Sequence, residues 1–204
     1  MGPMPFRAKI VRGAAVLTAL LLVATLALGA ATDRTVPLKC TRGPDGQSYR
    51  HIVTMPASQP VGSTFTVRID GVSIGPISHF GLRYVHNMTA DYTIPAGTTY
   101  VEGSARIVPG TGTDNVRSNA RVTHDASGIH MLLPARIENG GTYTPPSIEF
   151  QVKAVGPAGS VASLGFVGTG VDANALVMGN VHTACSPNPV PYTIGSTTLE
   201  AAAP

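Results

Sequence analysis

Histidine is the residue type in this 204-residue chain that could bind a metal ion or respond to pH, and all six copies fall where strands or strand ends are expected. His124 and His130 flank a predicted turn at residues 125–128. If the loop comprises residues 126–128, the two imidazoles face each other across a hairpin, close enough for one metal ion or for pH-dependent repulsion. A four-residue loop removes this pairing. We interpret His124 and His130 as ordinary polar strand residues and predict no metal site.

The sequence contains no recognisable motif for hydrolytic catalysis. An activated serine is commonly carried on a Gly-x-Ser-x-Gly turn, which the chain lacks. Ser78 and His79 are adjacent, but neighbours on a strand point to opposite faces. The glycines at 110–112 are not followed by the Lys-Ser/Thr pair of a phosphate loop. Another pair, His51 and His182, approaches only if the terminal strands pair. We therefore predict no catalytic residue and no cofactor.

The two cysteines, Cys40 and Cys185, are predicted to form a disulfide bond. An even number of cysteines in an exported chain usually means a bridge. The loop that it closes has about 146 residues, for which the chain-entropy model gives at most about 5 kcal/mol of stabilisation. A redox or metal-binding pair generally shows the close C-x-x-C spacing that is missing here.

The first 31 residues have the features of an export signal. Arg7, Lys9 and Arg12 precede an uncharged run at 13–32, and small residues follow its apolar core at 27–31. We predict a cleavable signal helix over 1–31. An uncleaved anchor is the alternative, because an uncharged run of about 20 residues can cross a bilayer. Removal of the signal leaves no further membrane span.

Net charge disappears with the signal, because three of the 14 basic residues and none of the 11 acidic ones lie within it. The mature chain is therefore neutral in formal charge, and its charges are scattered. This balance gives no support for binding to nucleic acid or to an anionic membrane through a broad basic surface.

The rest of the chain shows the period-two alternation of half-buried β-strands. Three segments alternate clearly, at 64–70, 82–89 and 148–153. Further strands are expected at 36–40, 49–54, 99–107, 117–124, 129–134, 161–167 and 180–185. Ten short strands and no helical period predict an all-β antiparallel sandwich in one domain over 32–194. We expect a last short strand near Tyr192 and a flexible C-terminal tail at 195–204.

Several sequence blocks resemble one group of proteins, the small exported actinobacterial proteins with an immunoglobulin-like β-sandwich. The blocks are the cysteine after the signal, Gly62–Val67, Tyr92–Thr98, and Gly140–Phe150 leading into 154–160. Most members of this group have no assigned function, so the resemblance implies a fold and an extracellular or cell-envelope location. It carries over no functional residue.

These observations together predict a non-enzymatic secreted or cell-envelope module with a structural or interaction role. Its partner would be an unidentified protein or envelope component. One alternative is a carrier that holds an apolar, lipid-like ligand between its sheets, for which a continuous interior cavity would be the sign. A second is a hydrolase with an unrecognised site, marked by histidine, serine and acidic side chains in one cleft.

Overall fold

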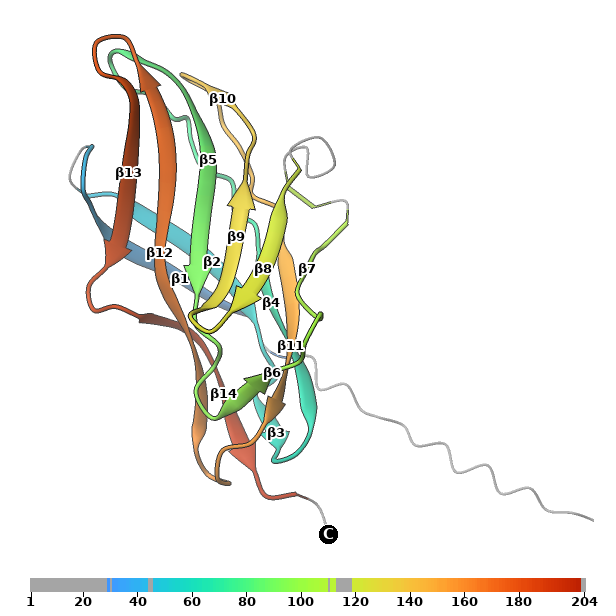
Figure 1. Ribbon diagram of the computed structural model, residues 1–204. Coiled ribbons are helices and arrows are strands. Elements are labelled where there is room, and N and C mark those ends of the chain that lie inside the picture. Colours follow the sequence, from blue (N-terminus) through green and yellow to red (C-terminus); the bar gives the residue numbers. More distant parts are fainter. Residues whose placement is uncertain (1–28, 30, 44–45, 110, 113–118, 203–204) are drawn as a thin grey trace, which may run out of the picture.

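The computed structural model describes residues 29, 31–43, 46–109, 111–112 and 119–202. Almost all of the predicted signal, at 1–31, lies outside the described residues. The described part contains fourteen β-strands and no α-helix, so it has no helix long and apolar enough to span a bilayer. The prediction of an all-β antiparallel sandwich is confirmed, and a single parallel strand pair is the exception among the described strands (Figure 1).

Two sheets make up the sandwich. The first contains β1 (Ala31–Cys40), β2 (Ser48–Thr54), β4 (Thr64–Asp70), β6 (Thr98–Tyr100), β7 (Arg106–Ile107) and β11 (Ile148–Ala154). The second contains β3 (Ser58–Pro60), β5 (Leu82–Tyr92), β8 (Arg121–Asp125), β9 (Gly128–Leu133), β10 (Ile137–Glu138), β12 (Val161–Ala175), β13 (Gly179–Pro187) and β14 (Tyr192–Glu200).

Strand β1 joins the two sheets. Residues 31–37 pair with β2 in the first sheet, and residues 38–40 pair with β13 in the second. The strand order is therefore continuous from β11 through β4, β2, β1, β13, β12, β5 and β9 to β8. The seam between the sheets is a hydrogen-bonded strand pair.

Alternating side chains fill the space between the sheets. In β4, Phe65, Val67 and Ile69 are buried, and Val67 lies opposite Phe150 of β11. Phe166 on β12 is fully buried in the same core. Burial of each such side chain contributes about 1.5–3 kcal/mol. The alternation in the sequence thus identifies the core face correctly.

A smaller apolar cluster lies towards the end of the sandwich where β12 and β13 are connected. Val85, Met88, Leu133, Ile137 and Tyr143 form this cluster. Two partly buried residues of the 71–81 loop, Ile74 and Ile77, pack against it. At this end a loop therefore covers part of the second sheet.

The C-terminal tail was predicted wrongly from residue 195. Strand β14 continues to Glu200, with Leu199 fully buried and the Thr197 hydroxyl donating to the Pro56 carbonyl at 2.9 Å. Leu199 belongs to the main core, and this burial orders the segment. The strand expected at 99–107 is also corrected, since it forms two short pieces, β6 and β7.

Candidate functional site

The cysteines are placed as predicted. Cys40 and Cys185 form a disulfide bond and are direct partners across the β1–β13 pair. The bond therefore lies at the seam where the first strand passes from one sheet to the other. It covalently fixes the strand pair that joins the two sheets.

The facing arrangement of His124 and His130, which a three-residue loop would have produced, does not occur. Asp125 pairs with Gly128, so the loop has only two residues, and His130 lies opposite Thr123 while His124 lies opposite Ile129. This register puts the two imidazoles on opposite faces of the hairpin. Gly128 is needed here, because it has φ of 140° and a Cβ atom at its position would lie 2.0 Å from the Tyr92 carbonyl oxygen.

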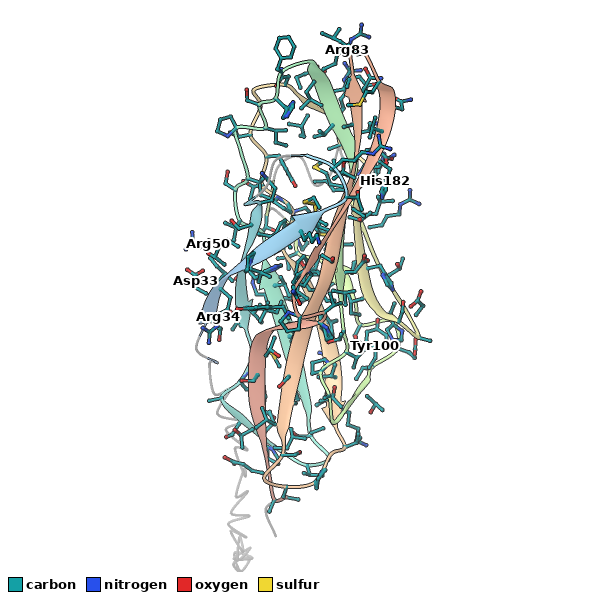
Figure 2. All side chains as sticks on the ribbon, turned by 90° about the vertical axis from the view of Figure 1, so that its left-hand side faces the viewer. Asp33, Arg34, Arg50, Arg83, Tyr100 and His182 are labelled. Carbon is teal, nitrogen blue, oxygen red and sulfur yellow. A yellow bond between two sulfur atoms is a disulfide. The ribbon has the colours of Figure 1, made fainter. Side chains whose placement is uncertain are left out.

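Each of these histidines has other partners. The His124 ring stacks on Tyr100 with 3.8 Å between ring centroids. Its Nδ1 lies 3.9 Å from a carboxylate oxygen of Glu102. Figure 2 labels Tyr100 on the right of the view.

His130 lies in a cluster that the sequence did not reveal. Its Nδ1 is 2.8 Å from an oxygen of Asp91, and its Nε2 is 3.0 Å from both the Ser127 hydroxyl and Asp125. The order serine, histidine, aspartate has the connectivity of a nucleophile, a base and an orienting acid. The pairing of Asp91 with His130 across β5 and β9 brings Asp91 to the hairpin that carries the other residues.

The electrostatics of this cluster oppose nucleophilic catalysis. The Ser127 hydroxyl donates to Asp125 at 2.5 Å, although a nucleophilic serine must donate to a neutral imidazole. Desolvation lowers the pKa of His130, but hydrogen bonds with Asp91 and Asp125 outweigh it and raise that pKa. A raised pKa favours the imidazolium, which cannot accept a proton. Through His130, the cluster connects the turn to Asp91 on β5.

Asp172 anchors a second polar group, on β12. It accepts hydrogen bonds from the Asn87 amide at 2.9 Å and from Nδ1 of His182 at 2.7 Å. His182 is largely exposed, whereas His51 is fully buried and neither of its ring nitrogens has a hydrogen-bond partner. Among the described residues, no three His, Cys, Asp or Glu side chains are grouped to hold a metal ion.

His51 is a polar side chain within the apolar core. It is 0% exposed, and neither ring nitrogen has a hydrogen-bond partner. Tyr49, Tyr92 and Phe166 surround the ring, with centroids 4.4–5.9 Å away. Burial lowers the pKa of His51 to about 4, so the imidazole is neutral at pH 7. The alternation of residues 49, 51 and 53 in β2 is the sequence signal that could have placed it inside.

The interior leaves little room for a carried ligand. A cavity of about 10 Å³ lies beside His51, and a cleft of about 170 Å³ is lined by residues that include Tyr49, Ile74 and Met88. Both volumes fall below the roughly 300–1,000 Å³ of typical ligand pockets. A depression of about 310 Å³ near Arg106 lies at the surface and carries the Arg106–Glu149 ion pair. A depression of about 210 Å³ shares Ser48, Tyr49 and Ile74 with the cleft, so the open space at these residues is larger than the cleft alone.

Four large apolar side chains stand in solvent at one end of the sandwich, and we call this group the apolar tip. The exposed fractions are 101% for Phe80, 62% for Leu176, 96% for Val177 and 65% for Met178. Leu176–Met178 form the turn between β12 and β13, and Phe80 lies in the loop before β5. The Leu176 amide donates to the Gly81 carbonyl at 2.8 Å, which holds the two loops side by side (Figure 1).

Polar side chains lie behind the apolar tip. Arg83 is exposed at this end, as Figure 2 shows, and has no side-chain partner among the described residues. Arg136 packs over the Tyr84 ring at 3.6 Å and forms an ion pair with Glu138 at 2.6 Å. In the strands that lead into the turn, Asn174 donates to Asn180 at 2.7 Å.

Comparisons with known proteins find similar structures without a close relative. No protein-family model and no curated protein matches the sequence. A Corynebacterium diphtheriae protein described as membrane anchored shares 13% identity and a TM-score of 0.43, over 85% of this chain and 38% of its own length. A cohesin module from a Clostridium perfringens glycoside hydrolase shares 12% identity and a TM-score of 0.40, over 83% of this chain and 100% of its own length. The RrgB pilus protein of Streptococcus pneumoniae shares 10% identity and a TM-score of 0.38, over 69% of this chain and 22% of its own length.

Proposed function

We propose that this chain is a non-enzymatic module of the cell envelope that acts by contact, and that the apolar tip is its contact surface. The exposure of four large apolar side chains on two adjacent loops carries this proposal. Isolated apolar residues are common on protein surfaces, but grouped ones mark sites of interaction. Elsewhere in the described residues, the other exposed large apolar side chains are Val155, Val161 and Val190.

The position of the apolar tip supports a role in contact rather than in folding. Full burial of each of its side chains would yield about 1.5–3 kcal/mol. This free energy is not gained, because the four side chains stay exposed. Polar residues would have formed the turn equally well, so folding alone does not explain the apolar ones. The hydrogen bond between Leu176 and Gly81 keeps the loops together, so the four side chains are presented as one group.

The disulfide supports an extracellular location for the module. Disulfide bonds form and persist in oxidising compartments and are rare in the cytosol. The bond between Cys40 and Cys185 fits the export that the N-terminal segment predicts.

The proposal is tested by the association of the protein with the envelope of its own host. We expect the double variant Phe80→Ser/Val177→Ser to be released by washing, while the wild type stays bound. The matched control is Val161→Ser/Val190→Ser, since these two valines are each 54% exposed and lie outside the apolar tip. Equal retention of the tip variant and the wild type would contradict the proposed contact surface.

A further inference from the structure

We propose that the apolar tip inserts into the headgroup region of a lipid bilayer that contains anionic lipids. This inference rests on the proposed function, because it names what the apolar tip contacts. The neutral overall charge of the mature chain gives no broad attraction to a membrane. The attraction would be local, and it follows from the shape, charge and hydrogen bonding at this end.

The projecting shape of the apolar tip is suited to insertion into a lipid bilayer, which can surround it. Phe80 and Val177 are almost completely exposed, so they project from the surface and do not line a groove. A flat protein surface would leave the sides of these projecting groups in water. The boundary between headgroups and acyl chains surrounds a projecting loop on all sides to a depth of about 5–10 Å.

The charges around the apolar tip favour anionic headgroups. Arg83 is exposed here without a side-chain partner among the residues that the structure describes. The acidic side chain on β10, Glu138, is neutralised by its ion pair with Arg136. Arginine can lay its apolar stem along an acyl surface while the guanidinium binds phosphate. The unpaired charge at this end is therefore positive.

Hydrogen bonding at the apolar tip is suited to shallow insertion. The Leu176 amide is already bonded to the Gly81 carbonyl, so this amide does not need water. The bond between Asn174 and Asn180 puts a polar pair directly behind the turn. A polar pair at this position marks the depth at which insertion would stop.

Sedimentation with vesicles tests the inference on the protein purified from its own host. We expect binding to phosphatidylcholine vesicles that contain phosphatidylglycerol, and weaker binding to phosphatidylcholine alone. Phe80→Ser/Val177→Ser should reduce binding by more than about tenfold, since each lost apolar contact is worth about that factor. Val161→Ser/Val190→Ser should bind like the wild type. Arg83→Gln should remove the preference for the anionic vesicles.

Fluorescence gives a second readout, because the chain contains no tryptophan. Val177→Trp should show a blue shift on addition of anionic vesicles and quenching by brominated lipid, whereas Val161→Trp should show neither. Thermal unfolding of each variant without vesicles checks that the fold is kept. An unshifted Val177→Trp spectrum in a folded protein would overturn the inference.

The lipid inference and the proposed function fail in different ways. If the wild type ignores both kinds of vesicle while envelope retention still depends on Phe80 and Val177, the lipid inference is wrong and a protein partner takes its place. If envelope retention does not depend on these residues, the proposed contact surface itself is wrong.

Discussion

The buried imidazole of His51 makes the stability of this fold depend on pH. Because burial depresses the pKa in the folded state to about 4, the folded state favours the neutral ring. The unfolded chain binds a proton near the ordinary pKa of about 6.5. The stability is therefore fully present above pH 6.5, and it falls as the pH decreases from 6.5 towards 4.

We predict that His51→Leu removes this acid sensitivity. The wild type should lose up to about 3 kcal/mol of unfolding free energy between pH 7.5 and pH 4, because a pKa shift of one unit corresponds to about 1.4 kcal/mol. His51→Leu should lose much less over this range and be at least as stable at pH 7.5, since it removes two buried nitrogens that lack partners. Urea unfolding at both pH values measures the difference. Parallel losses in the two proteins would contradict the prediction.

His130 has the opposite dependence, since its pKa is raised in the folded state. Its contribution is fully present below the unfolded pKa of about 6.5 and is lost as the pH rises through the folded value. Asp91→Asn removes one of the two carboxylates and should lower the titration midpoint of His130 in an NMR experiment. Asp172→Asn is the control, because its carboxylate contacts His182 instead. An unchanged midpoint in Asp91→Asn would show that this carboxylate does not hold the proton.

The polar clusters show which part of the site could be inferred from sequence. The disulfide was predicted from the cysteine count, but the partners of His130 depend on register. The loop has two residues instead of the three that would place His130 opposite His124. His130 therefore lies opposite Thr123. Gly128 also approaches the Tyr92 carbonyl closely, a tertiary contact that local sequence does not show.

At the level of elements, the β1–β13 seam should depend on its covalent bond. We predict that Cys40→Ser/Cys185→Ser lowers the unfolding free energy by about 2–5 kcal/mol, because the bridge restricts the unfolded chain between residues 145 apart. Denaturant unfolding of the oxidised wild type and the double variant measures this. The reduced wild type serves as a control and should match the variant. A difference below about 1 kcal/mol would mean that β1 is held by its other contacts.

Strand β14 should contribute to the core and not act as a tail. We predict that Leu199→Ala destabilises the fold by about 2–5 kcal/mol, the range for large-to-small changes at fully buried sites. Glu200→Ala, at the exposed neighbouring position, should have little effect. Thermal and urea unfolding distinguish the two. Similar small effects from both would support the tail that the sequence predicted.

Strand β12 explains why the apolar tip could not be predicted from sequence. From the sequence, this strand was expected only at residues 161–167. In the structure, the strand continues to Ala175 through register shifts near Gly168 and Gly170. A Cβ atom at Gly170 would lie 2.8 Å from the Thr89 hydroxyl, so the glycine permits close strand packing. The longer strand carries Leu176–Met178 to the end of the molecule.

At the scale of the whole molecule, the fold class could be predicted from local sequence patterns, but the apolar tip could not. Period-two alternation in segments such as 64–70 and 148–153 was enough to predict a sandwich and its core face. The apolar tip combines two loops that lie almost 100 positions apart in the sequence, one of which contributes a single residue, Phe80, and the other three, Leu176–Met178. Their proximity depends on the pairing of β5 with β12.

The bridged seam also has a mechanical consequence. Cys40 lies at the end of the first strand, and Cys185 lies on β13, 145 positions further along the chain. A pulling force applied at the two ends of the chain acts first on residues 31–37 of β1, which pair with β2, and on β14, which pairs with β12. While the bond holds, only the segments before Cys40 and after Cys185 can be drawn out. The chain between the two cysteines cannot be extended until the bond breaks.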